Sequence, residues 1–222
     1  ANQGACTHPC RWKYAVVEEQ RPGEYLPVYE NERGTYIFNS KDLCMIEHIP
    51  ELLDSGIDSY KIEGRMKTAL YVATVARTYR IAIDDCLKSR ELYESKLDWY
   101  RQQIAACTYR QFTTGFFFNK PHEESQIYDS NTYNVGYTYL GVINGKNAKG
   151  LYEIEQRNKF SVGETIEIMR PNGDNDSVVV REIFDEDGNS METCPHPQQK
   201  LFINLGVELS DCDILRRKED QE

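Results

Sequence analysis

The feature that most constrains the fold is a change of pattern near Gly136. Beyond it, apolar and polar residues alternate in short runs, and turn signals such as Pro171-Asn172-Gly173 separate the runs, as is typical of antiparallel strands. Five to seven such strands in about 85 residues predict a small antiparallel β-barrel over residues 136–218, after a polar linker at 120–135. The expected strands lie at 139–142, 151–154, 164–169, 177–184 and 200–204.

The first half of the chain shows the longer period of helices. We expect a strand at 34–38, a helix at 42–55, a strand at 57–62 and helices at 66–88 and 91–107. In the first helix Asp42 is the expected N-cap, Pro50 a kink or break, and Gly56 the stop. This order predicts parallel strands with crossover helices, here about two βα units from the end of a parallel barrel. The predicted fold class is therefore α/β plus all-β.

The helix at 66–88 carries an apolar stripe, which predicts a buried face. If exposed, it would leave several hundred Å² of apolar surface, more than monomers usually tolerate. Covering about 400 Å² contributes roughly 10 kcal/mol before entropy costs. We expect either upstream strands or a second copy of the chain, hence a homo-oligomer through the truncated barrel face, to cover it. The stripe consists of Ala69, Val72, Ala73, Ala76, Tyr79, Ile83 and Leu87.

Cysteines are concentrated near the start of the chain. Cys6, Cys10 and Cys44 lie within 39 residues, together with His8. Thiolates bind soft metals, and iron–sulfur clusters usually take four of them, so a fourth ligand would be His8 or lie upstream. The spacing of Cys6 and Cys10 differs from that of zinc knuckles, which leaves zinc as the weaker alternative. Unliganded buried thiols remain the other interpretation.

Charge and composition limit the partners. Residues 1–120 are neutral overall, so the whole net charge of −10 lies in residues 121–222, which disfavours general polyanion binding there. Nucleic-acid contacts would use local basic pairs such as Arg11/Lys13 and Arg65/Lys67, which are otherwise solvated surface. No run approaches the roughly 18 apolar residues of a membrane span. With an odd count of 7 scattered cysteines, a cytoplasmic protein with reduced thiols is expected.

The motifs of hydrolytic enzymes are not found. The sequence has no HExxH and no GxSxG motif, and the four histidines are scattered. A cysteine nucleophile would need a histidine beside it in space, which the sequence cannot establish. Glu63-Gly64-Arg65 ends an expected barrel strand, where α/β folds place functional groups; an ordinary strand-to-helix turn is the alternative. Because the chain opens on polar residues without Met, we expect it to be the C-terminal portion of a longer protein.

Several long segments together resemble the U32 peptidase family, also called collagenase-like proteases. They are residues 2–14 (Asn-Gln-Gly-Ala-Cys-Thr-His-Pro-Cys-Arg-Trp-Lys-Tyr), 36–45, 60–67 (Tyr-Lys-Ile-Glu-Gly-Arg-Met-Lys), 114–116, 162–168 and 195–199. The resemblance is greatest to the tRNA-hydroxylation subgroup, which forms 5-hydroxyuridine at the wobble position, requires prephenate and holds an iron–sulfur cluster. It implies the C-terminal part of a TIM-like barrel at 1–119, followed by a β-barrel domain.

Two functions follow as hypotheses. The first is a tRNA-modifying enzyme with a 4Fe-4S cluster. The resemblance implies that its ligands are an upstream cysteine pair plus cysteines matching Cys6, Cys10 or Cys44, and subgroups differ in which of these they use. A prephenate-derived small molecule would be a further partner. The second is a collagenase-like peptidase acting on a protein substrate, with structural or catalytic cysteines. The candidate substrate-binding residues are Arg11, Lys41, Glu63, Arg65 and Lys67. This portion alone is expected to be inactive.

Overall fold

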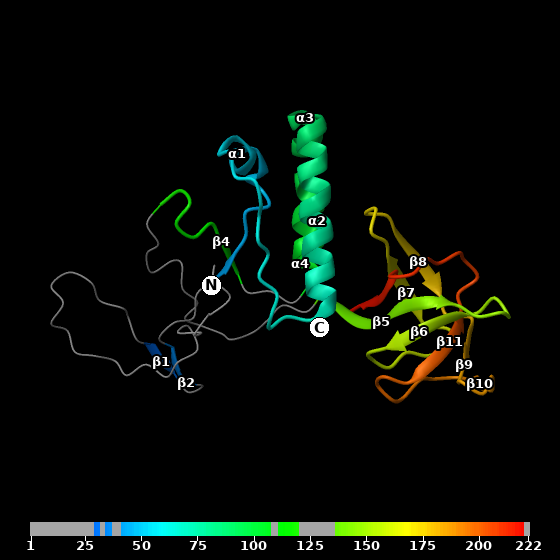
Figure 1. Cartoon of the computed structure of the whole chain (residues 1–222). Coiled ribbons are helices and arrows are strands. Elements are labelled where there is room, and N and C mark those ends of the chain that lie inside the picture. The colour runs from blue at the N-terminus through cyan, green and yellow to red at the C-terminus, as the bar shows by residue number, and fades with distance from the viewer. Residues whose placement is uncertain (1–28, 32–33, 37–40, 108–110, 120–135, 220–222) are drawn as a thin grey trace. The chain divides into compact units, whose positions relative to one another are not determined.

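The computed structural model describes residues 29–31, 34–36, 41–107, 111–119 and 136–219 (Figure 1). The chain divides into two compact units, residues 1–39 and 40–222. In the first, β1 (Tyr29–Asn31) and β2 (Gly34–Tyr36) pair antiparallel, with Tyr29 opposite Tyr36. A strand was predicted at 34–38, and it is present over 34–36; its partner is this hairpin strand and not a parallel barrel strand.

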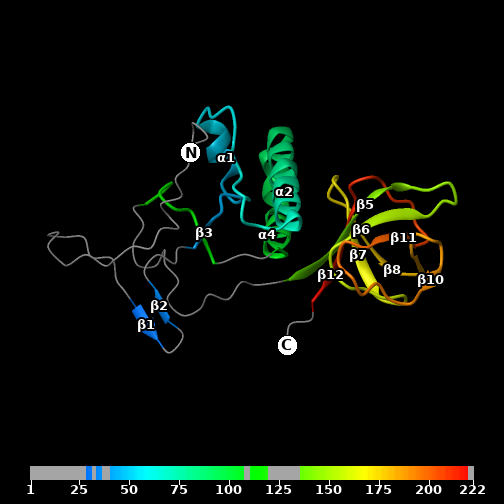
Figure 2. The same ribbon diagram turned by 60° about the horizontal axis from the view of Figure 1, so that its bottom comes forward.

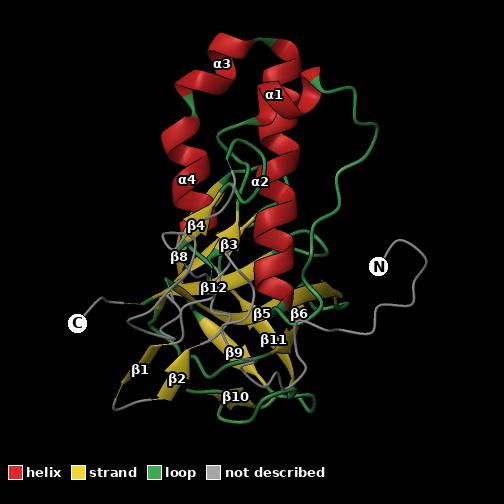
Figure 3. Ribbon diagram, turned by 90° about the vertical axis from the view of Figure 1, so that its left-hand side faces the viewer, coloured by secondary structure: helices red, strands yellow, loops and turns green. Residues whose placement is uncertain are grey.

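Four helices follow in the second unit. They are α1 (Ile49–Asp54), α2 (Ala69–Lys88), α3 (Arg90–Ser95) and α4 (Leu97–Ala105). Thr68 caps α2 by accepting a hydrogen bond from the Tyr71 amide, and Ser89 both ends α2 and caps α3. In Figure 3, α2 and α4 lie side by side and α3 joins them at one end.

The expected helix at 42–55 is largely wrong. Asp42 does not cap a helix but lies in β3 (Asp42–Leu43), and α1 begins only at Ile49. Pro50 occupies the first turn of α1, where its missing amide costs no hydrogen bond. Gly56 follows the helix with a positive φ of 71°, as a C-terminal glycine should.

The apolar stripe expected to be buried on α2 is covered only in part: Tyr79 and Ile83 are half-buried and pack against a buried apolar cluster. Val72 is 40% and Leu87 66% exposed. The buried face is instead mixed, and it includes Thr74, Arg77 and Asp85. These polar side chains are buried because each finds a partner, as Asp85 does with Lys96 and Tyr100. Hydrophobic spacing could not show those partners.

The strand expected at 57–62 is also absent; these residues form an irregular segment. A strand needs hydrogen bonds from a neighbour, and no described strand lies beside this segment, in which Ile57 and Ile62 are exposed. In the described part of the chain the one parallel pairing joins β3 to β4 (Phe112–Thr113). The described residues therefore do not confirm the βα units of a TIM-like barrel.

The C-terminal part is a curled antiparallel sheet of eight strands, visible in Figure 2. Its order is β10-β9-β11-β6-β5-β12-β7-β8. The strands are β5 (Tyr137–Lys146), β6 (Tyr152–Gln156), β7 (Thr165–Met169), β8 (Asn175–Val179), β9 (Glu182–Phe184), β10 (Ser190–Met191), β11 (Lys200–Asn204) and β12 (Ile214–Lys218). Alternate residues of these strands, such as Leu140, Ile154, Ile168 and Leu201, form the core.

The antiparallel fold predicted for this part is thus present, but as a curled sheet in which β10 and β8 are edge strands. An isolated bridge between Ser161 and Thr193 adds a further link. The run expected at 177–184 is divided into β8 and β9, and β12 was not predicted. Separately, none of the described helices combines the length and apolar character needed to cross a membrane.

Helix α2 contacts the sheet through β7 and β12. Leu70, Met169 and Ile214 form a small apolar cluster. Beside it, Arg77 donates to the Arg170 carbonyl at 2.9 Å and to Asn175 Oδ1 at 2.8 Å. Arg77 also donates to Gln103 Oε1 on α4, at 2.6 Å. One buried guanidinium therefore ties two helices to the β7–β8 hairpin.

Candidate functional site

The candidate site is built around Cys44, which follows β3. The parallel pairing of β3 and β4 fixes its backbone, because the Cys44 amide donates to the Thr113 carbonyl at 3.0 Å. From α2, the Tyr79 hydroxyl accepts from the Met45 amide at 2.8 Å and lies 3.7 Å from Cys44 Sγ. A side chain 35 positions along the chain thus holds the half-buried thiol in place.

A basic residue, Lys67, belongs to the same region and forms an ion pair with Asp42. Lys67 precedes α2, and its Nζ lies 3.3 Å from Asp42 Oδ2 and 4.9 Å from the centre of the Tyr71 ring. We call Asp42, Cys44, Lys67, Tyr71 and Tyr79 the Cys44 cluster. Two of the residues singled out from the sequence, Cys44 and Lys67, therefore belong to one cluster of polar groups.

Burial raises the pKa of the two thiols of this region, Cys44 and Cys107. Burial raises the pKa of Cys44, and hydrogen bonds to the Ile46 backbone and to Tyr79 only partly oppose it. Burial likewise raises the pKa of Cys107, to about 11, although the positive charge of Lys67 acts in the opposite direction. A raised pKa makes Cys44 a poor nucleophile. The cluster is thus better suited to binding than to covalent attack on a peptide.

The other expected site residues are not all brought together. Glu63 and Arg65 are exposed, and the Arg65 amide donates to Glu63 Oε1 at 2.9 Å within one turn. Gly64 between them packs closely on α2, because a Cβ there would lie 2.5 Å from Val72 Cγ2. Lys41 is half-buried beside Asp42. Cys6, Cys10 and Arg11 lie outside the described residues.

Sequence reasoning missed Tyr79 and Asp42 as site residues. Tyr79 was assigned to the apolar stripe and Asp42 to a helix cap. The one available signal was the hydroxyl of Tyr79 within an otherwise apolar stripe, since a buried tyrosine hydroxyl needs a partner.

The described residues do not by themselves form a metal site or a set of catalytic residues for hydrolysis. No group of three or more His, Cys, Asp or Glu side chains among them could hold a metal ion. His48 lies 3.3 Å from Glu51 and stacks on Phe118. Within the described ranges, neither His48 nor His196 hydrogen-bonds through its ring to a serine or cysteine.

The chain thus has a mixed α/β part, in which helices pack beside the Cys44 cluster, followed by a curled antiparallel sheet. Residues 1–127 match peptidase family U32, and residues 136–216 match the C-terminal domain of that family. The chain therefore belongs to peptidase family U32.

Several curated relatives are similar over most of the chain. tRNA hydroxylation protein P1 of Bacillus subtilis is 32% identical over 98% of this chain and 51% of the relative. tRNA hydroxylation protein P of Escherichia coli is 33% identical over 94% of this chain and 54% of the relative. A collagenase of Porphyromonas gingivalis is 32% identical over 77% of this chain and 40% of the relative. The chain thus spans about half the length of the first two relatives.

Proposed function

We propose that the full-length protein takes part in the hydroxylation of tRNA, forming 5-hydroxyuridine at the wobble position. The observation that carries this proposal is that relatives named tRNA hydroxylation proteins align with nearly the whole chain. Burial raises the pKa of Cys44, which disfavours Cys44 as the activated thiolate that cysteine-dependent proteolysis needs.

An iron–sulfur cluster is the proposed cofactor, with zinc as the alternative. Replacing a ring hydrogen of uridine by a hydroxyl is an oxidation, and a cysteine-held cluster supplies electron transfer when bound. Cys44 has the right donor atom and a fixed backbone, so it fits as one ligand. Cys6 and Cys10 would supply two more, and they lie outside the described residues.

Two other side chains of the Cys44 cluster, Tyr79 and Lys67, also have roles in this proposal. Tyr79 fixes the position of Cys44 Sγ and of the Met45 amide. Lys67, oriented by Asp42, adds a positive charge to the Cys44 cluster, which can attract a phosphate of the RNA. Both side chains reach the site from α2 or the turn before it, so helix packing sets the geometry.

The experiment uses the full-length protein in a strain lacking its gene. Cys44→Ala is compared with Cys86→Ala, a buried cysteine on α2 outside the Cys44 cluster, and wobble 5-hydroxyuridine is measured by mass spectrometry of tRNA. We expect Cys44→Ala to lose the modification and Cys86→Ala to keep it. Full modification by both variants would refute the role of Cys44, and absence of any modification by the wild type would refute the function.

A peptidase acting on collagen-like substrates is the second candidate. The similarity to a relative named collagenase favours it. It predicts that the purified full-length protein cleaves denatured collagen with a defined turnover, and that loss of Cys44 leaves tRNA modification unchanged. These two measurements separate it from the first candidate.

A further inference from the structure

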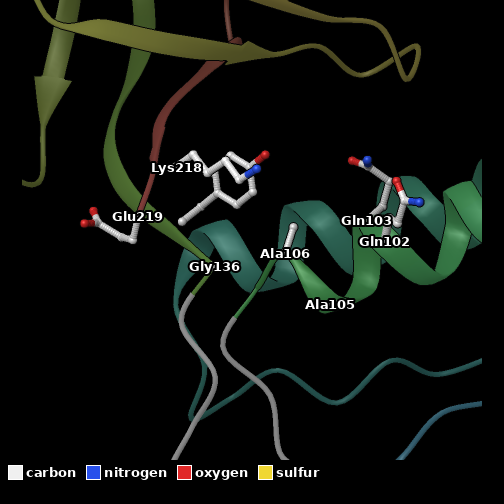
Figure 4. A pocket seen from close by; sticks show the side chains of 8 residues that line it. Gln102, Gln103, Ala105, Ala106, Gly136, Lys218 and Glu219 are labelled. Atoms are coloured by element: carbon white, nitrogen blue, oxygen red, sulfur yellow. The ribbon is translucent and has the colours of Figure 1, made fainter. Parts of the chain in front are cut away.

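A cavity of about 590 Å³ lies where the end of α4 meets the start of β5 and the end of β12. Its walls come from Gln102, Gln103, Tyr137, Lys218 and Glu219, and from the small residues Ala105, Ala106 and Gly136. Figure 4 shows the two glutamines on one side and Lys218 on the other, with the carboxylate of Glu219 pointing away from the glutamines. The volume is in the range of small-molecule sites.

Several polar groups that line this cavity can form further hydrogen bonds. The Gln103 carbonyl oxygen accepts from Arg77, which leaves its amide NH₂ group for another partner. Gln102 and Lys218 are exposed, and neither has a side-chain partner within the described ranges. The carboxylate of Glu219 lies 3.4 Å from Arg217 Nη2, so its charge is already partly balanced.

Two buried arginines lie behind the cavity walls. Arg216 is 1% exposed, and its guanidinium carbon lies 4.0 Å from the centre of the Tyr137 ring. Arg77 is 8% exposed, and its Nε has no hydrogen-bond partner among the described residues. The Glu167 carboxylate accepts from Arg216 Nε at 2.6 Å, and its negative charge also acts on Arg77.

This arrangement brings two buried positive charges close to one another behind the cavity. Of these two arginines only Arg216 hydrogen-bonds to Glu167, and Arg77 forms no ion pair within the described ranges; burial together with the charge of Arg216 lowers the pKa of Arg77 to about 10. A buried charge without full compensation is costly, and a bound anion would reduce that cost. Lys218 at the cavity wall adds a third cation.

We propose that this cavity holds one nucleotide of an RNA strand. Its phosphate lies beside Lys218, and the edge of its base is bound by the amides of Gln102 and Gln103, since amide side chains pair well with base edges. The proposal rests on the proposed tRNA function, and it adds a second contact point for the RNA. A free nucleotide has the same chemistry, so the test includes both.

The experiment measures binding of fluorescently labelled tRNA to the full-length protein by anisotropy at several salt concentrations. For Lys218→Gln we expect a three- to tenfold loss of affinity at low salt. The slope of log K against log salt should also fall by about 1, as for one lost phosphate contact. For Gln102→Ala we expect weaker binding with an unchanged slope. The matched control is Lys200→Gln on β11, an exposed lysine outside the cavity, which should change neither quantity.

The outcomes are separable. If the wild type binds tRNA and both cavity variants match it within twofold, the inference is wrong while the proposed function stands. If calorimetry shows uridine 5′-monophosphate binding that depends on Lys218 but no tRNA binding, the RNA occupant is refuted. If the wild type binds neither, the inference also fails. Wobble modification in the deletion strain then decides the proposed function independently.

Discussion

Replacing Asp85 by Asn should destabilise the helical hairpin by a measurable amount. Asp85 lies on the buried face of α2 and is 4% exposed. Its Oδ2 atom accepts from Lys96 Nζ at 2.8 Å and from the Tyr100 hydroxyl at 2.9 Å, which links α2 to the start and the middle of α4. The substitution keeps the shape of the side chain and removes its charge.

The expected loss follows from what each partner can do afterwards. Lys96 is 42% exposed, so water can solvate its ammonium group. The fully buried Tyr100 hydroxyl can still donate to the Asn carbonyl oxygen, but without a charged acceptor. We therefore expect a decrease of about 1.5–3 kcal/mol in the free energy of unfolding.

Trp99 provides the assay, because its ring meets that of Tyr100 edge-on at 5.6 Å. Its fluorescence is followed during urea unfolding in a Trp12→Phe background. The matched control is Asp84→Asn, the neighbouring residue, whose exposed ion pair with Arg80 should contribute less than about 0.5 kcal/mol. Equal effects of the two substitutions would refute the argument from burial.

Three further predictions concern thiols and close backbone approach. Since the pKa of Cys107 is raised from 9.0 to about 11, its contribution to stability is complete below pH 9 and is lost between pH 9 and 11. Between pH 9 and 11 the wild type should therefore lose roughly 2–3 kcal/mol more of its free energy of unfolding than Cys107→Ala does. Urea midpoints measured against pH for the two proteins check this. Among described cysteines, iodoacetamide should label exposed Cys212 first and buried Cys86, Cys107 and Cys194 slowly, which peptide mass spectrometry checks. Gly141→Ala should cost about 1–3 kcal/mol, because its Cβ would lie 2.7 Å from a β6 carbonyl oxygen; an unchanged urea midpoint would contradict this.

Hydrophobic spacing and turn residues act locally, and they predicted the helix at 66–88 and most strands beyond Gly136. The helix expected at 91–107 is present as two, α3 and α4, which meet at Lys96. Prediction from the sequence failed where distant partners decide the outcome. The buried face of α2 was predicted only in part because Arg77 and Asp85 are satisfied by groups on other elements. β12 was missed because an arginine such as Arg216 is usually a surface residue. In the structure Arg216 is buried, where it donates to Glu167 and lies over the Tyr137 ring.

In the candidate site, too, the sequence identified single residues but not the contacts between distant ones. Cys44 and Lys67 were identified from the sequence, but not the contact with Tyr79 that fixes the thiol. That contact joins residues 35 positions apart through the packing of α2 on the segment after β3. No local pattern encodes such a distance, since it depends on how the two elements meet.

The position of β12 has a consequence for the synthesis of the protein. Of the eight strands of this sheet, β12 is made last, and it lies inside the sheet between β5 and β7. Until residues 214–218 leave the ribosome, β10-β9-β11-β6-β5 and β7-β8 are two separate sheets, each with an unpaired inner edge. Such edges readily join other chains. A nascent chain that stalls before residue 214 would therefore be an early substrate for chaperones or proteases, although the other seven strands of this sheet had been made.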